Sequence, residues 1–195
     1  ANAKDFFLNI TDQIAENEFR LSYGVSVTDV NKDNKYDFVV TGFGFKNLAL
    51  SYKDGKLINI ANEKIFTDEE RRTIGVAACD IDQDGYEEIY FLNTDTYSGS
   101  KIYSDRLIDL NNNKFEDLFE KEINQNELNL TAGRSVVCVD RNGDGAYGIY
   151  VANYGGPTRF YELIRDRIKD QAKSLSIDKI TAVSYTHLTL PTNPE

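Results

Sequence analysis

The sequence predicts an all-β chain made of blade-like units, each with four antiparallel strands, as in a β-propeller. Three observations support this fold class. A strand, an acidic loop and a second strand occur together three times, led by Asp29, Asp80 and Asp140, which lie 51 and 60 residues apart. This period is typical of propeller blades. The copies are rich in Val, Ile, Tyr and Phe, and turn residues separate their apolar runs.

Each copy supplies the strands in the same order. The first strands are expected at 25–30, 76–81 and 136–139, and the second strands in DFVVTGF, EIYFLN and GIYVANY. Third strands follow in NLALSY, DRLIDL and RFYEL, and fourth strands in KLINIA and KFEDLF. The opening FFLNIT is expected to be the fourth strand of a preceding unit. Short loops between such runs indicate hairpins.

Two connecting segments are predicted to be accessory helices, at 67–73 and 165–174. Thr67 and Glu70 have the spacing of a capping box. A repeat of stacked helices is disfavoured, because the residues beside the acidic loops are β-branched or aromatic.

Composition excludes several classes of protein. The chain has 195 residues, is 41% hydrophobic and carries a formal net charge of −10, which disfavours nucleic-acid binding and favours cations. It contains no apolar run long enough to span a membrane and no signal peptide. Because it lacks an initiator Met, the missing signal peptide says little about compartment.

The C-terminal stretch VSYTHLTLPTNPE, residues 183–195, is interpreted as a tail derived from a sequencing adapter. The only histidine, His187, lies in it, so the native part offers no His for a catalytic triad or a zinc site. We therefore expect no catalytic residues and no organic cofactor. Residues 1–182 are predicted to be part of a propeller, with blade-like repeats at about 20–66, 71–123 and 131–180.

The acidic loops have the spacing of a calcium site. Ca²⁺ takes six to eight oxygen ligands, and a tight loop can direct alternate side chains toward one point. In the second copy the predicted ligands are Asp80, Asp82, Asp84, the Tyr86 carbonyl and Glu88. Gly85 permits the sharp turn.

The other two copies repeat this spacing with differences. The first supplies Asp29, Asn31, Asp33, the Lys35 carbonyl and Asp37. Its Asn34 replaces the glycine and tolerates a left-handed backbone. The third supplies Asp140, Asn142, Asp144 and the Ala146 carbonyl. Gly148 stands where its final carboxylate would be, so weak or absent binding is expected there.

The acidic loops have two alternative interpretations. An EF-hand requires a bidentate Glu at position twelve and flanking helices, but that position is Val40, Phe91 or Val151. One such loop could also be a solvated turn, since Asp, Asn and Gly are common turn residues. Three copies in the same place favour metal binding. Magnesium is less suitable, because it tends to keep its water ligands.

The hairpins GVSVTDVNKDNKYDFVVTG, GVAACDIDQDGYEEIYFLNT and AGRSVVCVDRNGDGAYGIYVANY resemble FG-GAP/VCBS repeats of integrin-alpha-type propellers. More narrowly, they resemble the start of proteins of the cartilage acidic protein and ASPIC/UnbV type, over nearly all of residues 6–182. The resemblance implies a secreted, calcium-binding, seven-bladed propeller of the matrix or cell surface without catalysis. About three blades are present, so the chain is expected to be a fragment.

Two functions follow as hypotheses. The first is a non-enzymatic extracellular module that binds calcium and a protein or glycan partner in cell–matrix interaction. The second is a calcium-dependent polysaccharide lyase, which would need a basic residue near the metal to remove a proton. The sequence shows no convincing basic cluster at a loop.

Smaller features complete the sequence-based expectations. Asn9 and Asn129 begin N-glycosylation sequons, although chance occurrence explains such a short pattern equally well. Cys79 and Cys138 lie one and two residues before their aspartates, so strand alternation points them to opposite faces. Two buried free thiols are therefore favoured over a disulfide.

Overall fold

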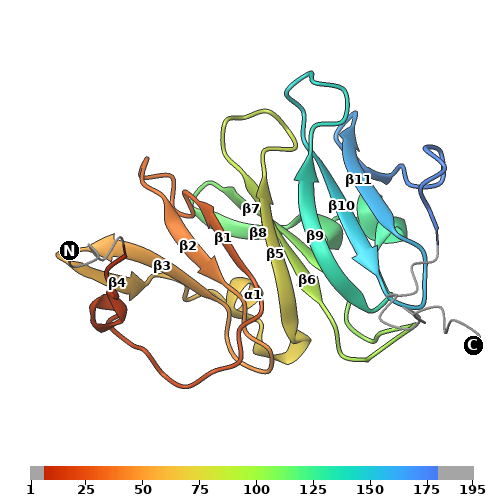
Figure 1. Ribbon diagram of the computed structural model, residues 1–195. Helices are drawn as coiled ribbons and strands as arrows, with labels where there is room; N and C mark the ends of the chain where they lie inside the picture. Colours follow the sequence, from red (N-terminus) through yellow and green to blue (C-terminus); the bar gives the residue numbers. More distant parts are fainter. Residues whose placement is uncertain (1–6, 180–195) are drawn as a thin grey trace, which may run out of the picture.

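The computed structural model describes residues 7–179, which form three four-stranded antiparallel sheets (Figure 1). The predicted adapter tail, 183–195, lies outside this range. In the first sheet the strands are β1 Val25–Thr28, β2 Asp37–Val40, β3 Leu48–Lys53 and β4 Lys56–Asn59. In the second they are β5 Thr73–Cys79, β6 Glu88–Asn93, β7 Arg106–Asn111 and β8 Lys114–Asp117. In the third they are β9 Gly133–Val139, β10 Gly148–Asn153, β11 Arg159–Ile164 and β12 Arg167–Asp170.

Each sheet is a meander in which strands adjacent in sequence are also adjacent in space. The first strands β1, β5 and β9 lie next to one another, so the sheets are arranged like neighbouring propeller blades (Figure 1). The predicted fold class is therefore confirmed: the chain is all-β and consists of four-stranded antiparallel blades. We call the sheets blades one, two and three.

The third and fourth strands of all three blades are joined by the same kind of turn. Both central residues have positive φ at Asp54–Gly55, at Asn112–Asn113 and at Arg165–Asp166. This is the type I′ geometry, which matches the twist of a β-hairpin. The predicted helix at 165–174 is therefore wrong, because this segment contains a hairpin turn and the fourth strand β12. Arg-Asp is an unusual turn pair, so the sequence carried little signal for it.

The other expected accessory elements also differ in detail. The helix predicted at 67–73 is replaced by two short helices, α1 Lys64–Thr67 and η2 Glu69–Arg71. No side-chain capping bond starts either of them. Residues 7–10 form no strand, and η1 Thr11–Gln13 follows them. Further 3-10 turns, η3 Leu118–Glu120 and η4 Glu122–Glu127, follow β8.

No helix in the described part of the chain is long and apolar enough to cross a membrane.

Apolar cores fill the space between neighbouring blades. Between blades two and three, the rings of Tyr90 and Tyr161 stack with centroids 6.1 Å apart, and Phe119 meets Tyr161 edge-on at 5.3 Å. Between blades one and two, Phe66 from α1 packs edge-on against Phe91 at 5.1 Å. Burial of each such side chain stabilises the fold by roughly 1.5–3 kcal/mol. These contacts fix how the blades, and the loops at their ends, lie relative to one another.

Cys79 and Cys138 form a disulfide bond, so the expectation of two free thiols is wrong. Alternation does point the two side chains to opposite faces of their own sheets. However, neighbouring blades meet through opposite faces, and the contact between β5 and β9 brings the two Cα atoms to 5.7 Å. This separation is within the range that a disulfide spans. The bond joins blades two and three just before the second and third acidic loops.

Candidate metal-binding loops

The three acidic loops occupy equivalent places in the three blades. Each connects the first strand of a blade to the second, and all three lie at the same end of the molecule (Figure 1). The strand pairs close in the same register, with Thr28 opposite Asp37, Cys79 opposite Glu88, and Val139 opposite Gly148. The repeated spacing therefore reflects a repeated structure, and Asp37, Glu88 and Gly148 are direct counterparts.

The backbone of each loop turns through two left-handed residues. At position six these are Asn34, Gly85 and Gly145, with φ of 65°, 91° and 86°. Asn therefore takes the conformation for which the other loops use glycine. Position four is also left-handed, at Lys32, Gln83 and Gly143. This second position could not be predicted from the sequence, because only the third loop places a glycine there.

The leading aspartate organises the backbone in every loop. In the second loop, Asp80 Oδ2 accepts a hydrogen bond from Gly85 N at 3.1 Å. In the first, the two carboxylate oxygens of Asp29 accept from the N–H groups of Asp33 and Asn34, at 3.0 and 2.6 Å. These bonds point the carboxylate into the concave side of the loop, as a metal ligand requires.

The middle positions also follow one pattern. The acid at position five accepts a hydrogen bond from the N–H of position seven in each loop, at 2.8–3.0 Å. The pairs are Asp33 with Lys35, Asp84 with Tyr86, and Asp144 with Ala146. This bond fixes the residue that is predicted to contribute a carbonyl ligand.

The second loop brings three predicted ligands together. Carboxylate oxygens of Asp80, Asp82 and Glu88 lie within 4.8 Å of one another. No other trio of acidic, His or Cys side chains in residues 7–179 does so. Asp84 lies outside the group, and its Oδ2 is 3.6 Å from Lys32 Nζ of the first loop. Of the four carboxylates in the predicted ligand set, three therefore converge without rearrangement.

Glu88 is the carboxylate on which this cluster depends. It is only 2% exposed, and its Oε2 accepts a hydrogen bond from Ile81 N at 2.8 Å. Burial raises the pKa of Glu88 to about 8, and the nearby charges of Asp82 and Asp109 add to the shift. A buried carboxylate among other carboxylates is costly to ionise unless a cation compensates it.

The first loop has a comparable buried acid, Asp37. It is fully buried, its Oδ2 accepts a hydrogen bond from Val30 N at 3.2 Å, and burial raises its pKa. Its Oδ1 is buried and accepts no hydrogen bond, and the same is true of Asp80 Oδ1 in the second loop. The Ser51 hydroxyl lies close enough to the Asp37 carboxylate to offset part of the rise in its pKa. Unpaired buried carboxylate oxygens are rare, and a bound ion is one explanation for them. The first two loops therefore fit a hard cation such as Ca²⁺.

The third loop differs at this point. Asp140 accepts hydrogen bonds from Gly143 N and Gly145 N, which lower its pKa. Arg141, at position two of this loop, forms an ion pair with Glu162 of β11, with Arg141 Nε 2.6 Å from Glu162 Oε1. The third loop leaves no buried carboxylate oxygen without a partner among the described residues.

Sequence reasoning missed the residues that approach the second loop from other segments. Lys32 reaches it from blade one, stacking over the Tyr86 ring with Nζ 4.4 Å from the centroid. Asp109 belongs to β7, and burial raises its pKa. Gln83 Nε2 donates to Asp144 O at 3.4 Å and so links the second loop to the third. No spacing within one loop could reveal these contacts, because they depend on how blades pack.

The position-twelve residues Val40, Phe91 and Val151 lie in β2, β6 and β10, where no EF-hand ligand could be.

The two glycosylation candidates differ. Asn9 is exposed, whereas Asn129 is fully buried and its Nδ2 donates to Asp105 and Asn153. This packing leaves no room for a glycan on Asn129.

Comparison with known proteins supports the interpretation of the repeats. Residues 29–91 match the family model described as an FG-GAP-like repeat. Cartilage acidic protein 1 from Xenopus tropicalis is 41% identical over 181 residues, covering 83% of this chain and 28% of that protein. The Mus musculus protein of the same name is 38% identical over 209 residues, covering 92% of this chain and 32% of that protein. A T-cell immunomodulatory protein homolog from Plasmodium falciparum is 24% identical and is covered over 28% of its length. The chain therefore spans less than a third of these relatives.

Proposed function

We propose that this chain, which carries FG-GAP-like repeats and is homologous to cartilage acidic protein 1, is part of an extracellular, non-catalytic propeller module that binds Ca²⁺ and a protein or glycan partner. One observation carries the calcium proposal. In the second loop, three carboxylates converge within 4.8 Å, and one oxygen of Asp80 is buried without a partner. The first loop would hold a second ion, and the third would bind weakly or not at all.

The donor set favours calcium among the common ions. All the side-chain ligands are carboxylates or the Asn31 amide, which suit hard cations. The described residues include no histidine, and both cysteines are bonded to each other, so zinc lacks its usual ligands. Calcium accepts a larger and less regular set of oxygens than magnesium, as a hairpin loop would provide.

Two findings support an extracellular setting. The disulfide between blades two and three would persist in an oxidising compartment and is unusual in the cytosol. Two of the relatives reported above are named cartilage acidic protein 1. The carboxylates of the loops would then meet the calcium concentrations at which weak extracellular sites are filled, about 10⁻⁴–10⁻³ M.

A calcium-dependent lyase is the alternative, and Lys32 is the observation in its favour, because it is a basic residue next to the second loop. However, its ammonium group pairs with Asp84 and lies over the Tyr86 ring, so it is engaged in structural contacts. We therefore propose a non-catalytic role. Incubation with uronate-containing polysaccharides tests it, since unsaturated products in the presence of calcium would establish the lyase instead.

The calcium proposal is tested by a titration of the melting temperature. A ligand at one hundred times its dissociation constant stabilises the folded state by about 2.7 kcal/mol. We expect calcium to raise the melting temperature of the chain, and the double variant Asp80→Asn/Glu88→Gln to lose most of the part that the second loop contributes. Both substitutions preserve side-chain size, so the loop should keep its shape.

The matched control is Asp166→Asn, which removes an exposed acid from the β11–β12 turn at a position where Asn is tolerated. It should keep the full calcium response. If calcium has no effect on the folded wild-type chain at millimolar concentration, the loops are ordinary turns and the proposal fails.

A further inference from the structure

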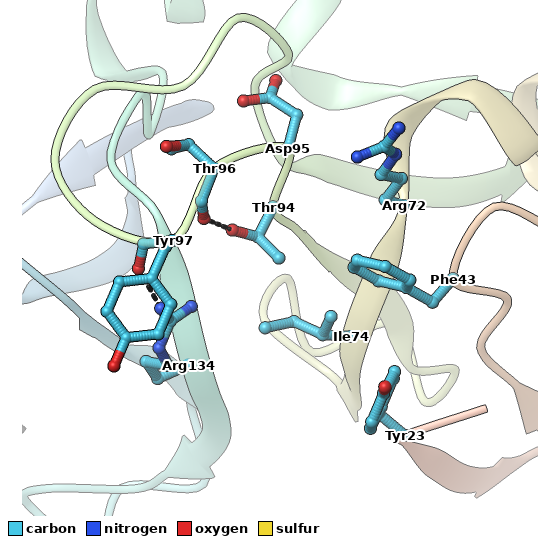
Figure 2. Close-up of a pocket in the computed structure, with 9 residues that line it drawn as sticks. All are labelled: Tyr23, Phe43, Arg72, Ile74, Thr94, Asp95, Thr96, Tyr97 and Arg134. Carbon is cyan, nitrogen blue, oxygen red and sulfur yellow. Dashed lines mark hydrogen bonds between the residues drawn. The ribbon is translucent and has the colours of Figure 1, made fainter. Parts of the chain in front are cut away.

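The end of the molecule opposite the acidic loops has an open hollow of about 730 Å³ (Figure 2). Tyr23 precedes β1, Arg72 precedes β5, and Arg134 is the second residue of β9. Because the acidic loops follow the other ends of these strands, the hollow and the candidate calcium sites lie at opposite ends of the blades. The three blades all contribute to its wall.

The hollow contains two arginines that have no acidic partner. Neither Arg72 nor Arg134 forms an ion pair within the described part of the chain, although the protein carries ten more negative than positive charges. Asp95 also lines the hollow, but its Oδ2 accepts from Ile102 N and Tyr103 N at 2.8 and 2.9 Å. Its carboxylate is thus held by its own loop.

Aromatic rings hold both guanidinium groups in place. Arg134 lies over the rings of Tyr97 and Tyr154, at 5.3 and 5.2 Å from their centroids. Its Nη1 donates to Gly133 O at 2.7 Å and its Nη2 donates to Tyr97 O (Figure 2). Arg72 lies over Phe43 at 5.9 Å. Stacking of this kind orders a guanidinium before any ligand arrives, and so reduces the entropy lost on binding.

The surface between the arginines is apolar. Figure 2 shows Ile74 between the Arg72–Phe43 side and the Tyr97–Arg134 side of the hollow. Tyr23 packs edge-on against Phe43 and is 64% exposed, and Tyr97 is 78% exposed. Exposed rings of this kind offer flat faces to a ligand that has both apolar C–H groups and polar groups.

We propose that this hollow binds an acidic glycan, with Arg72 and Arg134 each pairing with an anionic group and the exposed rings contacting the sugar. Guanidinium forks match the geometry of carboxylate and sulfate oxygens. A chain of sugars places anions at intervals and presents C–H faces between them, which corresponds to two cations separated by apolar surface. The proposal names a ligand class for the module proposed above, but it depends on the arginines and not on calcium.

Binding of fluorescently labelled oligosaccharides to the full chain, in excess EDTA, tests the inference. A hyaluronan oligosaccharide carries carboxylates only, a chondroitin sulfate oligosaccharide carries sulfates as well, and a dextran oligosaccharide is neutral. We expect salt-sensitive binding of the anionic probes and none of dextran. The stronger of the two anionic probes identifies the preferred anion. The variants Arg72→Gln and Arg134→Gln should each weaken binding about tenfold, as expected for loss of a charge-assisted hydrogen bond.

The matched control is Arg167→Gln, which removes an exposed cation in β12, away from the hollow. It should bind like the wild type. Equal binding of dextran, tighter binding of a polyglutamate peptide, or binding that survives loss of both arginines would overturn the inference. A cooperative melting transition of each variant in the same EDTA buffer serves as the folding check. The calcium-dependent melting shift separates the two proposals, because it should persist when the arginines are replaced.

Discussion

The second and third acidic loops have the same backbone path but differ at the ninth position. Glu88 and Gly148 occupy the same register position, opposite Cys79 and Val139. In the second loop a buried carboxylate faces other carboxylates, and an oxygen of Asp80 remains without a partner. In the third, no buried carboxylate oxygen of the described residues lacks a partner. The spacing of acids therefore defines the turn, whereas the ninth residue decides whether the turn contains a buried carboxylate.

Packing explains why the third loop has no ninth carboxylate. A Cβ at Gly148 would lie 2.6 Å from Phe160 Cζ and 3.0 Å from Tyr161 O. In blade two the register counterpart of Phe160 is Leu107, which pairs with Tyr90 as Phe160 pairs with Tyr150. The larger ring in blade three thus fills the space that a side chain at the ninth position would use.

The largest expected effect comes from the disulfide that joins these two blades. It closes a loop with a sequence separation of 59 residues, for which the loss of unfolded-state entropy corresponds to about 4 kcal/mol. Replacing Cys79 and Cys138 by Ala should lower the free energy of unfolding by about that amount, measured by chemical denaturation.

The calcium response of this variant sharpens the comparison. The ligands of the second loop all lie in one hairpin, so the calcium-induced rise in melting temperature should survive if the chain still folds. An unchanged denaturation midpoint would contradict the stabilising role of the disulfide. Loss of the calcium response in a folded variant would show that the second loop depends on blade three.

Gly148→Glu tests the packing explanation directly. The new Cβ has no room beside Phe160, so the substitution should destabilise the fold by about 1–3 kcal/mol and should not create a calcium response. The double variant Gly148→Glu/Phe160→Leu copies blade two and should recover part of the loss. Calorimetry with and without calcium measures both effects. Wild-type stability of the single variant would mean that the ring moves aside freely.

The pH dependence of calcium binding should also distinguish the loops. The pKa of Glu88 is raised to about 8, so this group is largely protonated at neutral pH without metal. Calcium needs the carboxylate form, and the affinity of the second loop should therefore fall by up to about tenfold per pH unit below 8. The stability of the metal-free chain should change with pH in the opposite direction. Its Glu88 binds a proton more tightly when folded, so stability from this group falls as pH rises from about 4.5 to 8.

Titration calorimetry at pH 6, 7 and 8 checks this prediction, and Glu88→Gln is its control. The variant should bind more weakly and lose the steep dependence. An affinity of the wild type that is independent of pH would mean that Glu88 is ionised without metal, against the effect of its burial.

Much of this architecture could be predicted from the sequence, because each blade repeats the same local signals. The strand pairs, the two hairpin turns with Asp54–Gly55 and Asn112–Asn113, and the alternation within the acidic loops all depend on neighbours in sequence. The fourth strand β12 was missed because the local signal for its turn is weak: Arg165–Asp166 contains neither Gly nor Asn.

The features that could not be predicted arise between blades. Strand alternation gave the correct faces for Cys79 and Cys138, but the inference from them failed because it treated each sheet as isolated. Lys32 likewise reaches the second loop only because blade one packs beside blade two. Arg72 lies in the connecting segment 67–73 that was predicted to be an accessory helix, yet packing places it in a hollow with Arg134. Contacts of this kind follow from blade geometry, which one repeat does not encode.

The smallest expected effect concerns Lys32, which belongs to the first loop but places its ammonium group beside the second. Its Nζ lies 3.6 Å from Asp84 Oδ2 and competes with calcium for that carboxylate. A partly exposed ion pair is worth about 0.2–1 kcal/mol, so Lys32→Ala should raise the calcium affinity of the second loop by about two- to fivefold.

The measurement uses an Asp29→Asn background, in which the first loop is weakened. Lys35→Ala is the matched control, because it removes the same charge from the same loop but has an exposed side chain without an ion pair to the second loop. If both variants change the affinity equally, the effect is one of net charge; if only Lys32→Ala does and the difference shrinks at high salt, neighbouring blades tune one another's metal sites through a single ion pair.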